Sequence, residues 1–221
     1  LGTEPRNDVF LAPIDGWDER SPLTFSTVIQ GADAETTAWI PADGRLYLHT
    51  NLDAPRKRLA VADPAQPTPD QWLDLLPETE LVLEDVTLTD DAVVATRTRH
   101  AVTELAVHDR ATGAHRYDVA LPGVGVAGTT GRIGGVGTDV WIGYGDFTTP
   151  GRVLHLDVPS GAVSPYADPP GAIPTDGITA ELVPFTGQDG TELHLFLVRA
   201  DDASKDGARP TILYGYGGFN I

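Results

Sequence analysis

A short apolar segment that ends on an aspartate recurs along this chain, and it limits the possible folds more than any other feature. It occurs as Val9–Asp15, Arg58–Asp63, Glu104–Asp109 and Arg152–Asp157, with aspartates 48, 46 and 48 residues apart. A period of this length that holds several short strands is typical of β-propeller blades and not of helical repeats. We therefore expect a mainly β protein built from four-stranded antiparallel blades.

Two of these intervals can be divided into strands by their period-two alternation and by the turn residues between the apolar runs. In the second unit we expect strands at residues 37–40, 45–50, 57–63 and 72–76. In the third unit we expect strands at residues 83–89, 92–98, 103–109 and 115–120. The same order of four strands in both units supports a repeated blade.

The repeated aspartate has a structural explanation. It opens the turns Asp109–Gly113 and Asp157–Gly161, where glycine takes a positive φ angle at no steric cost. An aspartate carboxylate in such a turn accepts backbone N–H groups. We therefore assign these aspartates to the turns and not to a metal site.

About three and a half units are visible, which is too few to close a ring, so the chain is expected to be part of a larger propeller. We assign residues 1–170 to the C-terminal part of that propeller. After the proline- and glycine-rich stretch 167–171 come apolar runs at 181–186, 191–198 and 211–214, the last of which ends in a glycine-rich turn. This order is typical of the start of an α/β-hydrolase sheet, to which we assign residues 171–221, truncated before the nucleophile.

Composition excludes several classes of function. The chain carries 32 acidic and 15 basic residues, for a net charge of −17, and has no basic stripe for a phosphate backbone, so nucleic acid is not an expected partner. Without cysteine it has no disulfides or thiolate ligands, and we expect no cofactor. The sequence contains no run of eighteen apolar residues, so we expect no membrane partner. A cytoplasmic location is the expectation, with a periplasmic or secreted one left open.

The end of the chain carries a resemblance to a known family. The run from Pro210 to Ile221, preceded by Asp189–Thr191 and Phe196–Val198, resembles the start of the catalytic domain in the prolyl oligopeptidase family of serine peptidases. The turn His108–Gly113 and the segment Phe147–Gly151 resemble later blades of its propeller. The resemblance implies a seven-bladed propeller joined to an α/β-hydrolase domain, and cleavage of short peptides on the carboxyl side of proline.

The resemblance also implies roles for two aromatic residues. Tyr216 would donate its hydroxyl to the oxyanion of the tetrahedral intermediate, and Phe219 would line the apolar pocket that takes the proline ring. Gly217 and Gly218 would let the backbone turn closely enough to place both. The sequence contains no Gly-x-Ser-x-Gly, and the family's serine, aspartate and histidine would all follow Ile221. We therefore expect the fragment by itself to be inactive and its histidines to be structural.

Three interpretations follow from the sequence. The first is a peptidase for short proline-containing peptides, in which the propeller gates access to the active site. In this interpretation the partner of the fragment is the rest of its own chain, namely the missing blades and the catalytic domain. The second is a related oligopeptidase that prefers a basic residue at the cleavage site, or that removes dipeptides or acylated residues. The third is a propeller interaction module without catalysis, against which the Tyr-Gly-Tyr-Gly-Gly-Phe-Asn ending argues.

Overall fold

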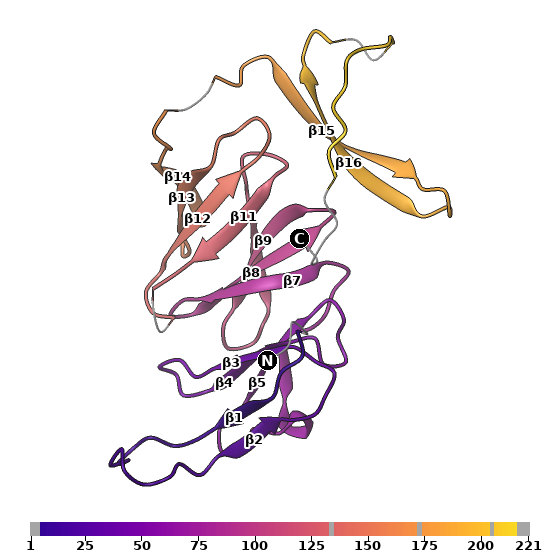
Figure 1. Ribbon diagram of the computed structural model, residues 1–221. Coiled ribbons are helices and arrows are strands. Elements are labelled where there is room, and N and C mark those ends of the chain that lie inside the picture. Colours follow the sequence, from indigo (N-terminus) through magenta and orange to yellow (C-terminus); the bar gives the residue numbers. More distant parts are fainter. Residues whose placement is uncertain (1–4, 133–134, 172–173, 204–205, 216–221) are drawn as a thin grey trace. The chain divides into compact units, whose positions relative to one another are not determined.

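In the computed structural model, two separate units contain only strands, turns and one short 3₁₀-helix among the described residues (Figure 1). The structure describes residues 5–132, 135–171, 174–203 and 206–215. The units are Leu1–Ile173 and Pro174–Ile221. The mainly β class predicted from the sequence is confirmed.

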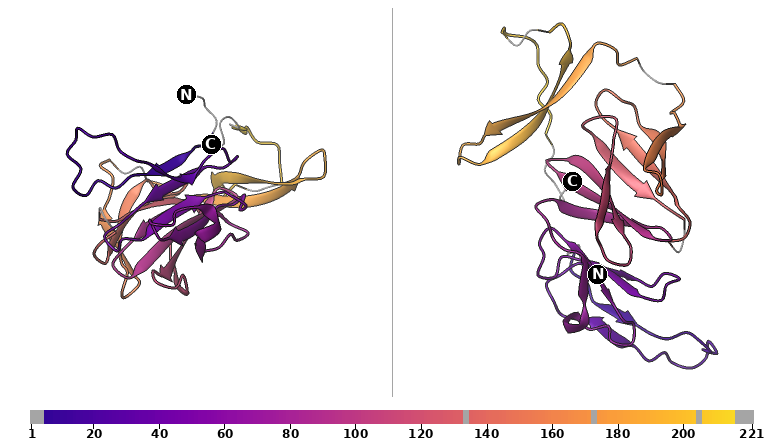
Figure 2. Two further views of the ribbon diagram at one scale, coloured as in Figure 1. Left: turned by 90° about the horizontal axis from the view of Figure 1, so that it is seen from below. Right: turned by 180° about the vertical axis from the view of Figure 1, so that it is seen from behind.

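The first unit is a series of antiparallel sheets, which we call blades (Figure 2). The incomplete first blade pairs β1 (Val9–Leu11) with β2 (Ser26–Ile29). The second blade consists of β3 (Thr36–Trp39), β4 (Leu46–Thr50), β5 (Arg58–Ala62) and β6 (Leu73–Leu76), with the 3₁₀-helix Pro69–Gln71 before β6. The third blade consists of β7 (Val82–Leu88), β8 (Ala92–Arg99), β9 (Val102–Asp109) and β10 (His115–Val119). The fourth blade consists of β11 (Val126–Thr130), β12 (Asp139–Gly145), β13 (Arg152–Asp157) and β14 (Ala162–Ala167).

In each complete blade the strands are hydrogen-bonded in chain order, as the repeat predicts. Strand boundaries in the second and third blades fall within one or two residues of the expected ones. The first blade differs, because β1 ends at Leu11 and Asp15 lies in a turn in which Trp17 N–H donates to the Ile14 carbonyl at 3.1 Å. Pro13, which lacks an N–H group, interrupts the ladder there.

Adjacent blades pack face to face, and β8 shows how the sequence produces this arrangement. Its residues Ala92–Thr96 are all buried, although a strand exposed on one face would alternate between apolar and polar residues. Val93 belongs to the core cluster shared with the second blade, and Val94 belongs to the cluster shared with the fourth. A central blade strand therefore has two apolar faces.

The β9–β10 turn confirms the structural role assigned to the repeated aspartate. The Asp109 carboxylate accepts hydrogen bonds from the backbone of Ala111 at 3.0 Å and of Thr112 at 2.9 Å. Gly113 has a φ of +73°, and a Cβ atom there would stand 1.8 Å from the backbone oxygen of Leu75 in the second blade. The glycine is therefore required both by the turn and by the close approach of the neighbouring blade.

The second unit is a long hairpin of β15 (Ile178–Thr186) and β16 (Glu192–Ala200), paired along nine residues of each strand. The strand expected at residues 211–214 is not formed, and Ile212, Leu213 and Tyr214 are more than 85% exposed. A strand needs a hydrogen-bonding neighbour, and residues 211–214 pair with no strand in the described part of the unit. That prediction is wrong for this structure.

Candidate functional site

Hydroxyl groups of the third and fourth blades meet where β7 and β8 approach β11. The Thr129 hydroxyl of β11 lies 3.0 Å from the Thr87 hydroxyl of β7 and 3.2 Å from the Thr96 hydroxyl of β8. In a propeller the first strand of each blade lies next to the central channel. We therefore call β3, β7 and β11, the first strands of the second, third and fourth blades, the inner wall.

An open cavity of about 450 Å³ lies at one end of this inner wall. Trp39 and Ile40 line it from the second blade, Leu88 from the third, and Arg132 from the fourth. Ile40 is 47% exposed, and Trp39 stacks on the buried ring of Tyr47 at a centroid distance of 5.9 Å. This end of the wall thus offers a mostly apolar surface with one arginine.

Elsewhere the exposed residues of the inner wall include two acids, one threonine and one valine. Glu84 and Asp85 of β7 are exposed at an irregularity in the β7–β8 register. Val126 and Thr130 of β11 are also exposed. These four residues include no acid–base pair or activated nucleophile.

One buried arginine connects three blades next to the cavity. Arg110 follows the turn aspartate, is 6% exposed, and its Nε donates to the Tyr47 hydroxyl at 3.1 Å. Its guanidinium pairs with Asp43 at 3.0 Å and donates to the carbonyls of Thr89 and Gly135, the latter at 2.8 Å. Arg110 therefore fixes the second, third and fourth blades relative to one another.

The charges around Arg110 shift the pKa values of their neighbours. Burial by itself would raise the pKa of the Asp43 carboxyl. Hydrogen bonds from the Tyr47 hydroxyl and the Arg45 backbone, together with the charge of Arg110, nevertheless hold this pKa below its ordinary value. Burial raises the pKa of Tyr47. The cluster is thus a carboxylate, a neutral phenol and two arginines.

Three histidines of the chain make contacts with residues of the strands. His49 Nε2 lies 2.8 Å from the Leu83 carbonyl, and His155 Nε2 lies 2.7 Å from Asp139 in the paired strand. His194 lies 3.7 Å from Glu192 in the same strand. Among the described residues, no group of three or more His, Asp or Glu side chains is placed to hold a metal ion.

The catalytic and substrate-binding candidates of the sequence lie beyond the described residues. Residues 210–215 have no regular secondary structure and are exposed. Tyr216, Gly217, Gly218 and Phe219 follow directly and are outside the described ranges. Their roles as oxyanion donor, turn residues and proline-ring contact stay predictions. No helix in the described part of the chain is long and apolar enough to cross a membrane.

Sequence reasoning missed the interblade role of Arg110 and a second cavity on the third blade, described below. Arg110 stands after the turn aspartate where the fourth blade has Val158, and both residues are buried. In the sequence, the only sign of this role is that the third repeat has a charged residue, Arg110, where the fourth has an apolar one. That signal identifies an unusual position but not its partners.

The blades, the inner wall and the turns that fix neighbouring blades define the class of this chain: a segment of a β-propeller followed by a separate β unit. The sequence profile described as "Prolyl oligopeptidase, N-terminal beta-propeller domain" matches residues 2–169. The chain belongs to the prolyl oligopeptidase family.

Two relatives show the extent of the similarity. The chain is 30% identical over 207 residues to the prolyl endopeptidase of Elizabethkingia miricola, covering 92% of this chain and 28% of that protein. It is 30% identical over 229 residues to prolyl oligopeptidase A of Amanita bisporigera, covering 99% of this chain and 29% of that protein. The chain thus spans less than a third of the length of these relatives.

Solved structures of prolyl oligopeptidases have the same fold as this chain over nearly its whole length. A prolyl endopeptidase structure matches 99% of this chain with a TM-score of 0.82 and 29% identity, over 31% of its own length. Prolyl oligopeptidase B of Galerina marginata, bound to a 35mer hydrolysis and macrocyclization substrate, matches 98% of this chain and 30% of its own, with a TM-score of 0.84 and 24% identity. This second likeness supports the fold alone.

Proposed function

We propose that the full-length protein is a serine endopeptidase that hydrolyses short peptides on the carboxyl side of proline. The observation that carries this proposal is the 30% identity to a prolyl endopeptidase over 92% of the chain. This chain supplies propeller blades, and the catalytic serine, aspartate and histidine belong to the part after Ile221.

The second unit is proposed as the start of the catalytic α/β-hydrolase domain. In this proposal the Tyr216 hydroxyl donates to the oxyanion and works with a backbone N–H beside the nucleophile. A donor aimed at developing charge in a site without water contributes about 2.7–4 kcal/mol to transition-state stabilisation. Phe219 provides the apolar contact for the proline ring, and the isolated 221-residue chain has no activity.

The proposed role of the propeller is to gate access to the active site. The inner wall of β3, β7 and β11 lines a passage that admits short peptides and keeps folded proteins out. Exclusion of bulk water from the covered site strengthens the electrostatic contacts made there. Support for this role comes from the wall itself, which is formed by side chains of three blades held together by Arg110.

The alternative within the same class is an oligopeptidase with another preference at the cleavage site. An aromatic residue at position 219 favours a proline pocket. The net charge of −17 instead favours attraction of cationic peptides, which added salt would weaken. A non-catalytic interaction module remains as the alternative from another class.

The deciding experiment measures hydrolysis of a chromogenic peptide with proline before the leaving group, using the full-length protein, Tyr216→Phe and Tyr214→Phe. Removing one hydroxyl changes packing little, so the first variant isolates the donor. We expect kcat to fall about a hundredfold or more in Tyr216→Phe. We expect Tyr214→Phe to match the parent, since that exposed side chain has no proposed role.

The same proteins are also assayed with three other kinds of chromogenic peptide. One has arginine before the leaving group, one has a free N-terminal dipeptide, and one has an acylated N-terminus. Faster cleavage of one of these would replace the proline assignment by the alternative specificity. No cleavage of any peptide would support the interaction module. Cleavage of proline peptides with equal rates in both tyrosine variants would keep the peptidase and remove the oxyanion role of Tyr216.

A further inference from the structure

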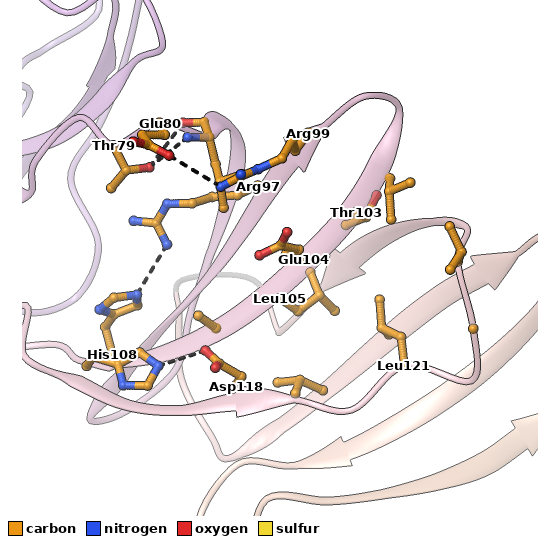
Figure 3. Close-up of a pocket in the computed structure, with 17 residues that line it drawn as sticks. Thr79, Glu80, Arg97, Arg99, Thr103, Glu104, Leu105, His108, Asp118 and Leu121 are labelled. Carbon is orange, nitrogen blue, oxygen red and sulfur yellow. Dashed lines mark hydrogen bonds and ion pairs between the residues drawn. The ribbon is translucent and has the colours of Figure 1, made fainter. Parts of the chain in front are cut away.

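The third blade contains a second cavity that the proposed peptidase mechanism does not use. It has a volume of about 670 Å³, within the usual range for small-molecule sites. Its walls come from β8, β9 and β10 and from residues 79–81 and 121–124, which flank the blade (Figure 3). One complete blade and its two connections therefore form it, so it does not depend on blades outside this chain.

A buried arginine lies on the wall of this cavity with most of its donors unused. Arg97 is 8% exposed, and its guanidinium makes one hydrogen bond, 3.3 Å long, to His108 Nε2. The other ring nitrogen of His108 lies 3.0 Å from the Gly113 carbonyl. A carbonyl only accepts, so Nδ1 carries the proton and Nε2 is the acceptor for Arg97. Four of the five guanidinium N–H groups remain.

No carboxylate neutralises Arg97 at contact distance within the described part of the chain. Burial lowers the pKa of Arg97, and Glu104 opposes that shift through charge attraction. Arg99, the second arginine of the cavity, is paired with Glu80 at 3.8 Å. Arg97 is thus a largely buried cation whose remaining N–H groups reach the open space of the cavity, and a planar carboxylate matches its fork of donors.

An unpaired acid stands across from this cation. Glu104 of β9 is directly opposite Arg97 in the strand register, is exposed, and makes no hydrogen bond within the described ranges. Figure 3 shows the two side chains on the same wall, with the Arg97 guanidinium turned toward His108 and the Glu104 carboxylate on its other side. Glu80 is paired with Arg99, and Asp118 with His115. Among the described residues that line the cavity, Arg97 and Glu104 are therefore the cation and the anion that have no ion-pair partner within contact distance.

This balance of charge selects the ligand. A phosphate or another dianion would be repelled by Glu80, Glu104 and Asp118, all of which line the cavity. A simple cation would meet Arg97. A neutral molecule with both charges satisfies the two contacts, and the apolar side chains of Val119 and Leu121 accommodate an apolar body between or beside them.

We propose that this cavity is a binding site for short zwitterionic peptides, whose C-terminal carboxylate binds Arg97 and whose N-terminal ammonium binds Glu104. Dipeptides and tripeptides have suitable charges, and an apolar side chain fits the Val119 and Leu121 wall. The site does not require the peptidase assignment to be correct. If that assignment holds, the products of the enzyme belong to the same ligand class.

The test uses the full-length protein after treatment with diisopropyl fluorophosphate, which blocks a reactive serine and keeps probes out of a catalytic site. Binding of alanyl-leucine, its N-acetyl form and its C-terminal amide is measured by titration calorimetry. We expect saturable binding of the free dipeptide and a loss of tenfold or more when either terminus is blocked, since each block removes a charged contact.

Two variants assign the contacts. In Arg97→Gln the dipeptide and its amide should bind equally, because the carboxylate has lost its partner. In Glu104→Gln the dipeptide and its N-acetyl form should bind equally, and this exposed substitution leaves folding intact even if Arg97→Gln does not fold. Arg20→Gln, an exposed arginine outside the cavity, should bind like the parent.

Three results would overturn the proposal. The first is no saturable binding of alanyl-leucine up to about 10 mM, which is about ten times a dissociation constant of 1 mM. The second is equal binding of the free, acetylated and amidated peptides. The third is that both Glu104→Gln and Arg97→Gln still bind the free dipeptide more tightly than its acetylated and amidated forms, as the parent does. The peptide would then bind elsewhere.

Discussion

Replacing Arg110 by methionine tests whether one side chain holds three blades together. The variant keeps much of the apolar volume but removes the donors to the Thr89 and Gly135 carbonyls and the ion pair with Asp43. Each buried acceptor left without a donor costs about 1–3 kcal/mol. Asp43 keeps the Tyr47 hydroxyl at 2.8 Å and is 29% exposed, so water offsets part of the loss. We expect a loss of about 3 kcal/mol.

Arg116 provides a matched control in the same strand-turn region. It pairs with Asp91 at 3.0 Å and Asp109 at 2.8 Å, but 29% of its side chain is exposed. Surface ion pairs contribute about 0–1 kcal/mol, so Arg116→Met should be much milder. The contrast between the two variants separates a buried interblade contact from a surface one of equal charge.

The assay is hydrogen exchange of the β8 amides in the full-length protein, because a multidomain protein need not unfold in one step. The expected loss corresponds to exchange about a hundredfold faster in Arg110→Met, against tenfold or less in Arg116→Met. Equal exchange in the two variants would refute the idea that Arg110 joins the blades. Faster exchange confined to the β9–β10 turn would refute it as well, since the effect would then be local.

Three further predictions concern the turns and the inner wall. Gly113→Ala should destabilise by several kcal/mol more than Gly44→Ala, because both have φ near +74° but only position 113 would place a Cβ against backbone; urea titration checks this. The pKa of Asp109 is depressed in the folded protein, so the ionised carboxylate stabilises the fold fully above its ordinary pKa of 3.8, and this stabilisation is lost as pH falls below 3.8. Acid titration should therefore show that the stability difference between the parent and Asp109→Asn shrinks only below pH 3.8. Thr129→Val should cost about 1–3 kcal/mol in urea unfolding, since two buried hydroxyls lose a shared partner, whereas Thr130→Val, at an exposed position, should be nearly neutral.

The parts of the fold that the sequence predicted well depend on local signals. The third blade was expected to contain a strand at 103–109, and β9 covers Val102–Asp109. Alternation and a turn aspartate followed by glycine act within a few residues, so they can be detected without knowing the neighbours. The strand expected at 211–214 had the same apolar signal, but strand formation also requires a partner, which local sequence cannot supply.

The cavity on the third blade was not predictable for a related reason. Arg97 and Glu104 are separated by the β8–β9 hairpin, and each by itself is an ordinary charged residue in a strand. Their significance comes from the burial of one and the exposure of the other. Burial depends on how the sheet packs against the preceding blade, through Val93 and Ala95 on the same face of β8 as Arg97.

The equivalent positions Arg110 and Val158 show how a repeated backbone supports different interblade contacts. Arg110 N–H donates to the Asp91 carbonyl at 2.9 Å, and Val158 N–H donates to the Thr138 carbonyl at 3.0 Å. Their own carbonyls accept from side chains of the preceding blade, Arg45 at 3.0 Å for Arg110 and the Tyr117 hydroxyl for Val158. The backbone of the turn therefore docks in the same way twice, while the side chain is free to vary. Valine adds to an apolar core, whereas arginine adds charged hydrogen bonds to two further blades. This single position therefore changes the kind of contact at a blade interface without altering the repeat.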